Sequence, residues 1–335
     1  MSLVDKIPKD YPYLNARIRA KGAQLLDRND YENLLKMKSN GIARKLEEGQ
    51  YSREINELGS MLDGTELVET ALQRNATRTL VELVDESSGS LEEILKVYVR
   101  RYDIESLKRL LRKKKQGEEL GTVVTPGFEY PIERLEKMHR NEREEIINSI
   151  EFEGALVDYS EYISAEQSLE EFERGIDQAY FDELEKLADK TGNKRLERFL
   201  RKELEYENLR IVIRLKRYDI EAEEIRNRCF NCEASNLVQA CIDAADFDEM
   251  LQLIRDSDWE IGMAEEVEEV EHQLKVSRLR SSLKNLRTAP LGLAPIMSFV
   301  VAKMVEVDNL RMMVQAKSTG AQDADKIREN LVISR

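Results

Sequence analysis

The chain has 335 residues, of which 35% are charged and only 6% are aromatic, and it carries a net charge of −14. Only 6 prolines and 15 glycines interrupt it, and this mixture favours amphipathic helices over β-sheet. The composition therefore predicts an all-α fold, and the negative charge argues against nucleic acid as the main partner.

The N-terminal residues show no basic segment followed by an apolar run, so we expect no secretory signal. The longest strongly apolar run, residues 291–302, is shorter than the roughly 20 residues that a membrane-spanning helix needs. Three cysteines, an odd number in a long chain, fit a reducing compartment. On its own sequence we expect a soluble intracellular protein.

Three similar phrases predict three long helices. The phrase beginning at Asp103 is DIESLKRLLRKK, the phrase beginning at Glu205 is EYENLRIVIRLK, and the phrase beginning at Glu306 is EVDNLRMMVQAK. Apolar residues before and within each phrase recur with helical spacing, which predicts helices over 94–114, 196–216 and 297–317. The apolar positions before and within a phrase fall on different sides of a helix, so each helix must bury different sides in its two halves or be kinked. A basic residue precedes each phrase at the same place, as Arg100, Lys202 and Lys303.

A second block recurs half a unit earlier. Residues 42–51, 146–155 and 250–259 share their apolar pattern and are 104 residues apart. Two blocks in one order and at one period predict a triplicated helical unit. We expect units over 1–120, 121–222 and 223–335, with breaks at 85–90, 121–131, 190–193 and 287–292.

Motifs for catalysis are missing from the sequence. There is no GxxxxGK[ST] phosphate loop and no GxGxxG after a strand, and His139 and His272 lack a metal-binding neighbour pattern. Cys229 and Cys232 form a lone CxxC without a second ligand pair, which favours a structural role. Acidic clusters at 168–174 and 264–272 fit solvated helix faces. The basic run 96–115 fits a solvated helix end, or a contact with anionic lipid or an acidic partner. We therefore predict no catalytic, cofactor-binding or metal-binding residues, and no small-molecule substrate.

Residues 292–331 resemble the C-terminal signature of the C subunit of archaeal and bacterial A/V-type rotary ATPases, which is equivalent to the d subunit of the eukaryotic vacuolar enzyme. The matching positions are Pro295, Ala302-Lys303, Glu306 and Asn309-Leu310-Arg311. Residues 11–35, with Asn15-Ala16-Arg17, resemble the opening phrase of that family, and the likeness extends over the whole chain. The first repeat departs from the pattern, with Ser106-Leu107-Lys108 in place of Asn-Leu-Arg.

The resemblance implies three similar helical domains in a pseudo-threefold, funnel-like arrangement. It implies a non-catalytic rotor subunit at the cytoplasmic face of the membrane, which links the central stalk to the membrane rotor ring and transmits torque. Its partners would be central-stalk subunits and ring subunits, without nucleic acid. The sequence leaves open the coupling ion, the ring size and the direction of operation.

The repeated polar residues are the candidate partner-binding positions, and they have two interpretations. The set is Arg17, Asn208, Arg210, Asn309 and Arg311. In the structural interpretation they tie helices together, with each arginine paired to a nearby carboxylate such as Glu207 or Asp308. In the functional interpretation, equivalent arginines line the funnel and meet the stalk. Two competing hypotheses for the whole chain are an all-α adaptor unrelated to rotary machines and a helical enzyme with dispersed carboxylates.

Overall fold

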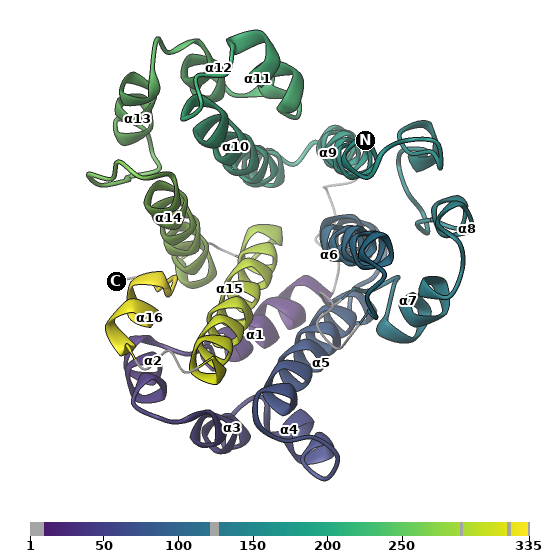
Figure 1. Ribbon diagram of the computed structural model, residues 1–335, viewed down its shortest axis with the longest axis vertical. Helices are drawn as coiled ribbons and strands as arrows, with labels where there is room; N and C mark the ends of the chain where they lie inside the picture. Colours follow the sequence, from purple (N-terminus) through teal and green to yellow (C-terminus); the bar gives the residue numbers. More distant parts are fainter. Residues whose placement is uncertain (1–9, 121–126, 289–290, 320–322, 334–335) are drawn as a thin grey trace.

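The computed structural model describes residues 10–120, 127–288, 291–319 and 323–333, and these residues form helices and no strand (Figure 1). The predicted all-α class is therefore confirmed. The long helices are α5 (Gly64–Asp85), α6 (Ser90–Gln116), α9 (Leu169–Thr191), α10 (Lys194–Lys216), α14 (Val267–Thr288) and α15 (Leu293–Ser318). The shorter ones are α1 (Asp10–Gly22), α2 (Arg28–Leu35), α3 (Ser39–Glu47), α4 (Ser52–Leu58), α7 (Ile132–His139), α8 (Arg143–Asn148), η1 (Tyr159–Glu161), α11 (Ala222–Arg228), η2 (Cys232–Ala234), α12 (Asn236–Asp243), α13 (Phe247–Arg255) and α16 (Ala324–Asn330).

The three helices predicted from the repeated phrase are α6, α10 and α15, and each contains its predicted range. The predicted breaks at 85–90 and 190–193 separate long helices from one another, and α15 begins at the end of the break at 287–292. Gly117 ends α6 with a left-handed φ of 68°, where a residue other than glycine would be strained. After α10 the left-handed position is taken by Asp219, with φ 53°. Gly320 and most of the break at 121–131 lie outside the described residues.

Helix α15 is buried on several sides, as the displaced apolar positions predicted. In this helix 17 of its 26 residues are buried. It packs against α14 and α5, and also against α1, α3, α6 and α10. With neighbours on so many sides, the helix has no single apolar stripe.

The short helices follow the period seen in the sequence. Helices α2, α7 and α12 begin at Arg28, Ile132 and Asn236, each 104 residues after the one before. Helices α3, α8 and α13, which carry the second repeated block, begin at residues 39, 143 and 247 with the same separation. The repeated blocks therefore occupy equivalent places in the order of helices.

Helices α6 and α10 each pack against helices that follow them in the chain. Helix α6 packs against α7 and α9, and α10 packs against α11 to α14. Helix α15 has few residues after it and packs instead against α1, α3 and α5 from the other end of the chain. Figure 1 shows these three groups around a central space. The division at residues 120 and 222 stays a prediction, because the chain reaches its third group from both ends.

A buried carboxylate in the middle of α15 ties these two ends of the chain together. Glu306 accepts hydrogen bonds from the Leu26 backbone N–H at 2.6 Å and from the Tyr51 hydroxyl at 2.6 Å. It also accepts from Gln50 at 2.7 Å and from Lys303 at 3.1 Å. Lys303 and Glu306 are only 1% and 3% exposed, so their charges depend on each other and on these neighbours.

The acid at the same place in the other two phrases has an equivalent role. Glu205 of α10 accepts from the Ser235 hydroxyl at 2.6 Å, at the start of α12, and from the Trp259 indole N–H at 2.7 Å. Asp103 of α6 accepts from the Tyr130 backbone N–H at 2.8 Å, just before α7. Each long helix thus holds the start of one short helix in its group.

The recurring basic residue contacts an aromatic ring within the second repeated block. The Arg100 guanidinium lies 4.9 Å from the centre of the Phe152 ring. The Lys202 ammonium lies 4.0 Å from the Trp259 ring, and the Lys303 ammonium lies 4.2 Å from the Tyr51 ring. The two repeated blocks therefore pack on each other in every group.

We predict that Glu306→Gln lowers the free energy of unfolding by about 3 kcal/mol or more, because it leaves the buried Lys303 ammonium without a carboxylate. Urea unfolding followed by circular dichroism measures this. Glu48→Gln is the matched control, since Glu48 pairs with Lys45 on the surface and should change stability by less than about 1 kcal/mol. Adding Lys303→Met to Glu306→Gln should recover part of the loss. Equal stability of the Glu306 variant and the control would contradict this account.

A second prediction concerns Asp103, whose pKa burial raises to about 6 despite its backbone hydrogen bonds. Since the pKa is higher in the native state than in the unfolded chain, its contribution to stability is complete below about pH 4 and is lost as the pH rises through 6. From pH 5.5 to 8.0 the wild type should lose about 1 kcal/mol relative to Asp103→Asn, which cannot ionise. Thermal unfolding of both proteins at the two pH values measures the difference, and a difference that does not change with pH would contradict the prediction.

Candidate partner-binding cavity

A cavity of about 660 Å³ lies between α6, α9, α10, α14 and α15. Its walls carry more basic than acidic side chains, although the chain as a whole has a net charge of −14. The basic residues are Arg101, Lys108, Arg109, Arg112, Arg210, Arg214, Lys275, Arg278 and Arg311, and the acidic ones are Glu105, Asp177, Glu207 and Asp308. The cavity is therefore a basic region inside an acidic protein.

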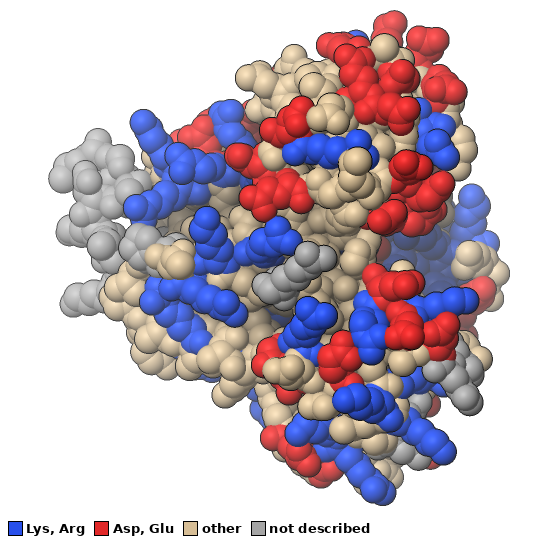
Figure 2. All heavy atoms as spheres, turned by 90° about the vertical axis from the view of Figure 1, so that its left-hand side faces the viewer, with Lys and Arg blue, Asp and Glu red and all other residues tan. Residues whose placement is uncertain are grey.

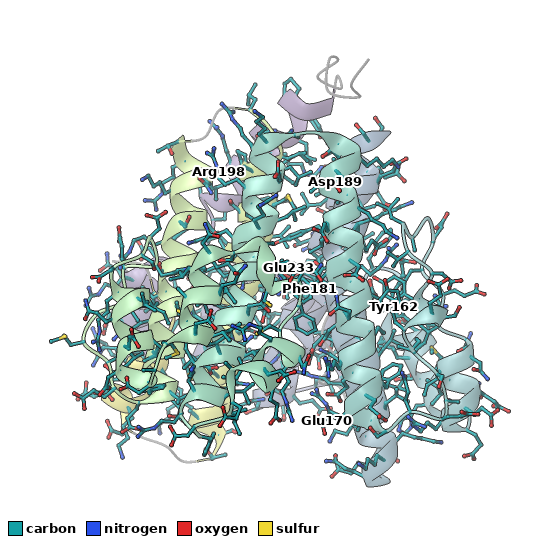
Figure 3. The ribbon with its side chains drawn as sticks, turned by 90° about the horizontal axis from the view of Figure 1, so that it is seen from above. Tyr162, Glu170, Phe181, Asp189, Arg198 and Glu233 are labelled. Carbon is teal, nitrogen blue, oxygen red and sulfur yellow. The ribbon has the colours of Figure 1, made fainter. Side chains whose placement is uncertain are left out.

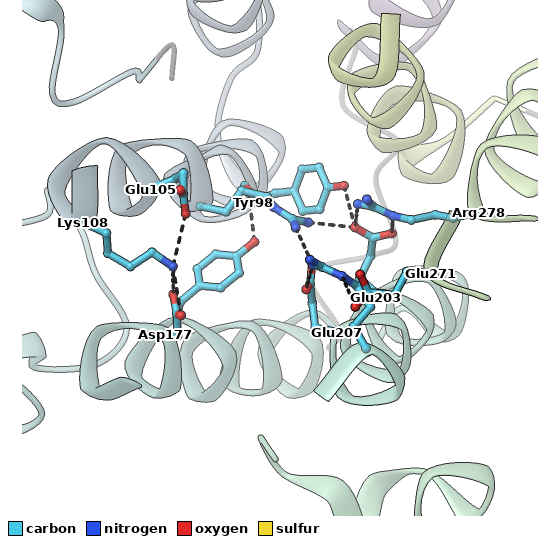
Figure 4. A network of polar contacts seen from close by, with 11 residues as sticks. Tyr98, Glu105, Lys108, Asp177, Glu203, Glu207, Glu271 and Arg278 are labelled. Atoms are coloured by element: carbon cyan, nitrogen blue, oxygen red, sulfur yellow. Dashed lines mark hydrogen bonds and ion pairs between the residues drawn. The ribbon is translucent and has the colours of Figure 1, made fainter. Parts of the chain in front are cut away.

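A buried network borders the cavity and joins three of its helices (Figure 4). Glu203 of α10 accepts from Arg278 of α14 at 2.8 Å and from Arg101 of α6 at 2.9 Å, and the Tyr98 hydroxyl lies 3.3 Å away. Burial by itself would raise the pKa of the Glu203 carboxyl, but Arg278 and Arg101 hold it below its ordinary value. The ionised carboxylate thus links α6, α10 and α14 at one level.

A second set of ion pairs joins α6 to α9 and α10 along the cavity wall. Lys108 binds Asp177 of α9 at 3.0 Å and lies 3.2 Å from Glu105 in its own helix. Arg101 binds Glu207 of α10 at 3.0 Å. Several wall cations are therefore already neutralised by acids from neighbouring helices.

Two of the candidate residues, Arg210 and Arg311, lie in the cavity wall. Arg210 pairs with Glu207 at 2.7 Å, whereas Arg311 is 3.8 Å from its nearest carboxylate, that of Asp308. The Nε atoms of both arginines are buried and have no acceptor among the described residues. Burial lowers the pKa of Arg311, and Asp308 only partly opposes this effect. Arg311 is thus a largely buried cation with weak compensation.

The asparagines of the candidate set act as structural ties. The Asn208 side chain donates to the Phe230 carbonyl at 2.6 Å and accepts from the Phe230 N–H at 2.8 Å. Asn309 makes the same pair of bonds to Val332, at 2.8 and 2.9 Å. Each amide thus fastens the segment after α11 or α16 to its long helix.

The contacts of the N-terminal copy of the motif fit the structural interpretation. Asn15 bonds to the carbonyl and the N–H of Gly292 at 3.2 and 3.3 Å, and so joins α1 to the start of α15. Arg17 is not among the residues that line the cavity, and it pairs with Glu82 at 3.0 Å and with Glu86. The motif therefore brings Arg210 and Arg311 to the cavity but leaves Arg17 on another surface.

The wall residues on α14 were not anticipated from the sequence. Lys275 is exposed, lines the cavity and has no ion-pair partner within the described ranges. Arg278, from the same helix, binds Glu203 75 residues away. Both lie outside the repeated phrase, so no local pattern distinguished them from other charged residues of a solvated helix.

Cys229, Cys241 and His272 do not line the cavity. Burial raises the pKa of both Cys229 and Cys241 to about 12, which keeps these thiols protonated at neutral pH. The His272 ring lies in hydrogen-bond contact with the Leu331 carbonyl at 3.2 Å.

Among the described helices, none combines the length and the apolar character that a bilayer span requires.

Comparison with known proteins gives one consistent result. A family model described as ATP synthase (C/AC39) subunit matches residues 14–330. The chain is 30% identical to the C subunit of the A-type ATP synthase of Methanococcoides burtonii, over 97% of this chain and 94% of that one. It is 27% identical to the protein of the same name from Haloquadratum walsbyi, over 96% of this chain and 97% of that one. The corresponding Archaeoglobus fulgidus protein is 28% identical, over 96% of each chain.

Proposed function

The chain belongs to the ATP synthase (C/AC39) subunit family, and we propose that it is a non-catalytic rotor subunit that links the central stalk to the membrane ring. The observation that carries this proposal is the basic cavity between the three equivalent long helices. In this role the cavity receives the end of the stalk, and the protein lies at the cytoplasmic face of the membrane. The ring would be bound at another surface.

Torque transmission requires a body that does not deform under load. The hydrogen bonds of Glu306, Glu205 and Asp103 hold α15, α10 and α6 to their own groups, and the Glu203 network joins α6, α10 and α14. Buried ion pairs such as those of Glu306 and Glu203 are costly to break, because each partner would be left as an uncompensated charge. These contacts support a rigid connector.

The excess of basic residues in the cavity wall favours a partner with acidic residues. Arg311 has only the 3.8 Å pair with Asp308 among the described residues, and Lys275 has no ion-pair partner there, so negative groups of a partner would compensate both cations. The enzyme hypothesis would need an apolar pocket in which acids converge. A wall with nine basic residues does not match that description.

We predict that Arg311→Ala weakens binding of the stalk subunits about tenfold while it lowers the free energy of unfolding by less than about 1 kcal/mol. The reason is that Arg311 makes only one long ion pair within the described part of the chain, so little native-state interaction is lost. Calorimetric titration with the purified stalk subunits measures the affinity, and thermal unfolding measures the stability.

The matched control is Arg17→Ala, which removes an arginine of the same motif outside the cavity. It should leave stalk affinity unchanged and cost stability, because Arg17 pairs with two carboxylates, those of Glu82 and Glu86. Loss of stability with unchanged stalk affinity in the Arg311 variant would favour the purely structural interpretation.

A further prediction concerns coupling in the whole complex. Vesicles that lack this protein should retain ATPase activity in the detached head but lose ATP-driven ion uptake, because rotation does work only if each connection holds under load. Adding the purified protein back should restore uptake, and a high-salt wash should remove part of it again, since polar contacts are screened by salt. Uptake that survives complete removal of the protein would contradict the proposed function.

A further inference from the structure

A second hollow lies between the start of α10, the second half of α14 and the start of α15, and it has a volume of about 520 Å³. Its walls carry the cations Arg195, Arg198, Lys202 and Arg278. Lys202 and Arg278 are paired inside the chain, with Glu205 and Glu203. Arg195 and Arg198 are exposed and form no ion pair within the described segments, so they are available to a ligand. We refer to this hollow as the α10–α14 groove.

The remaining walls of the groove combine apolar groups, neutral polar groups and two carboxylates. Of the two acids, Glu203 is bound to Arg101 and Arg278, and Asp258 is exposed at the rim, so the four cations still outnumber them. Leu291 is 54% exposed, which is unusual for a large apolar side chain, and Leu293 and Pro295 lie beside it in the lining. On the α14 side the groove is lined by Ser281 and Asn285, whose side chains make no hydrogen bond in the described part of the chain. The groove thus offers apolar contact, hydrogen-bonding groups and positive charge together.

The surface around the groove extends the positive charge. Lys194, Lys284 and Arg287 are exposed on the same two helices, and none forms an ion pair within the described ranges. Figure 3 places Arg198 at the same end of the molecule as Asp189, near the junction of α9 and α10. Figure 2 shows Lys and Arg side chains gathered toward its left edge and Asp and Glu side chains toward its upper right. The groove therefore lies on a basic part of an acidic protein.

We propose that the α10–α14 groove is a docking site for an acidic peptide turn of a protein partner, with carboxylates on Arg195 and Arg198 and an apolar side chain against Leu291. Arginine binds carboxylates in a two-pronged geometry, and serine and asparagine side chains suit the backbone of a turn. Charge complementarity favours an acidic ligand, since Arg195 and Arg198 form no ion pair with any described carboxylate.

The concave shape favours a peptide over a membrane surface. A flat layer of lipid headgroups attracts outward-pointing lysine and arginine residues and does not require a hollow with apolar walls. The lining residues come from three helices and from the segments beside them, including Asp258 and Trp259, and they enclose a volume that a short turn fills. Under the proposed function, on which this step rests, the turn belongs to a loop of the membrane ring, and the groove is the ring-binding end of the connector.

The test compares the full chain with Arg195→Glu/Arg198→Glu. Both residues are exposed, and acids are favourable near the N-terminus of a helix, so the variant should fold. Binding to the purified membrane ring in nanodiscs should fall at least tenfold at about 50 mM salt, and the difference should shrink at about 500 mM because salt screens exposed charges. The control is Arg44→Glu/Arg74→Glu, which makes the same charge change at exposed residues of α3 and α5 and should bind like the wild type.

Two further probes separate failure of the groove from failure of the proposed function. The first is a fluorescent peptide of alternating glutamate and leucine residues, which the wild type should bind and the groove variant should not. The second is a set of vesicles with one-third phosphatidylglycerol and no ring, which should not distinguish the two proteins.

The outcomes are distinct. A groove variant that binds the ring and the peptide as well as the wild type does would overturn the groove proposal and leave the proposed function intact. A wild type that binds the peptide through Arg195 and Arg198 but never the ring would support the groove and count against the proposed function. Vesicle binding that depends on Arg195 and Arg198, without peptide binding, would overturn the peptide assignment and identify lipid as the ligand.

Discussion

A carboxylate in the middle of each of the helices α6, α10 and α15, buried for Asp103 and Glu306 and partly buried for Glu205, is the constraint on which the arrangement depends. Glu306, Glu205 and Asp103 each accept a hydrogen bond from residues at or just before the start of a short helix. A charge taken out of water is tolerated only when its partners lie at hydrogen-bond distance. A long helix therefore cannot slide or rotate against its group without leaving this acid uncompensated. Asp103 also requires Gly127, because a Cβ at that position would lie 2.1 Å from its carboxylate oxygen.

In the group of α15, the buried carboxylate of Glu306 joins the two ends of the chain. The partners of Glu306 come from the other end of the chain, since Tyr51 is 255 residues away. Asn15 and Gly292 add a second contact between the ends, 277 residues apart. The groups of α6 and α15 share one hydrophobic core, while α10 to α14 enclose a core of their own. Because the chain closes on itself in this way, the three groups form one connected body.

The distribution of charge distinguishes the two proposed binding surfaces from the rest of the molecule. The chain has 66 acidic and 52 basic residues, yet the cavity and the α10–α14 groove both carry cations without close internal partners. The cavity is lined by residues from Arg101 onward in α6 and from Tyr206 onward in α10, whereas the groove uses the first turns of α10. The two surfaces thus lie at different levels along one helix, with the Glu203 network between them. If each surface binds a partner, as we propose, α10 connects the two sites directly.

The sequence by itself determined the helical class, the presence of the three helices α6, α10 and α15 and the end of α6 at Gly117, because helix periodicity and helix breaks are local properties. It also showed that Arg100, Lys202 and Lys303 recur and that a second block recurs. Only the tertiary structure showed that each of these basic residues contacts a residue of the second block, as Lys303 contacts Tyr51. It alone separated Arg17 from Arg311 and brought Arg278 to Glu203. The physical reason is that these side chains are compensated by partners far away in the chain, and no local pattern specifies which distant charge a buried residue will meet.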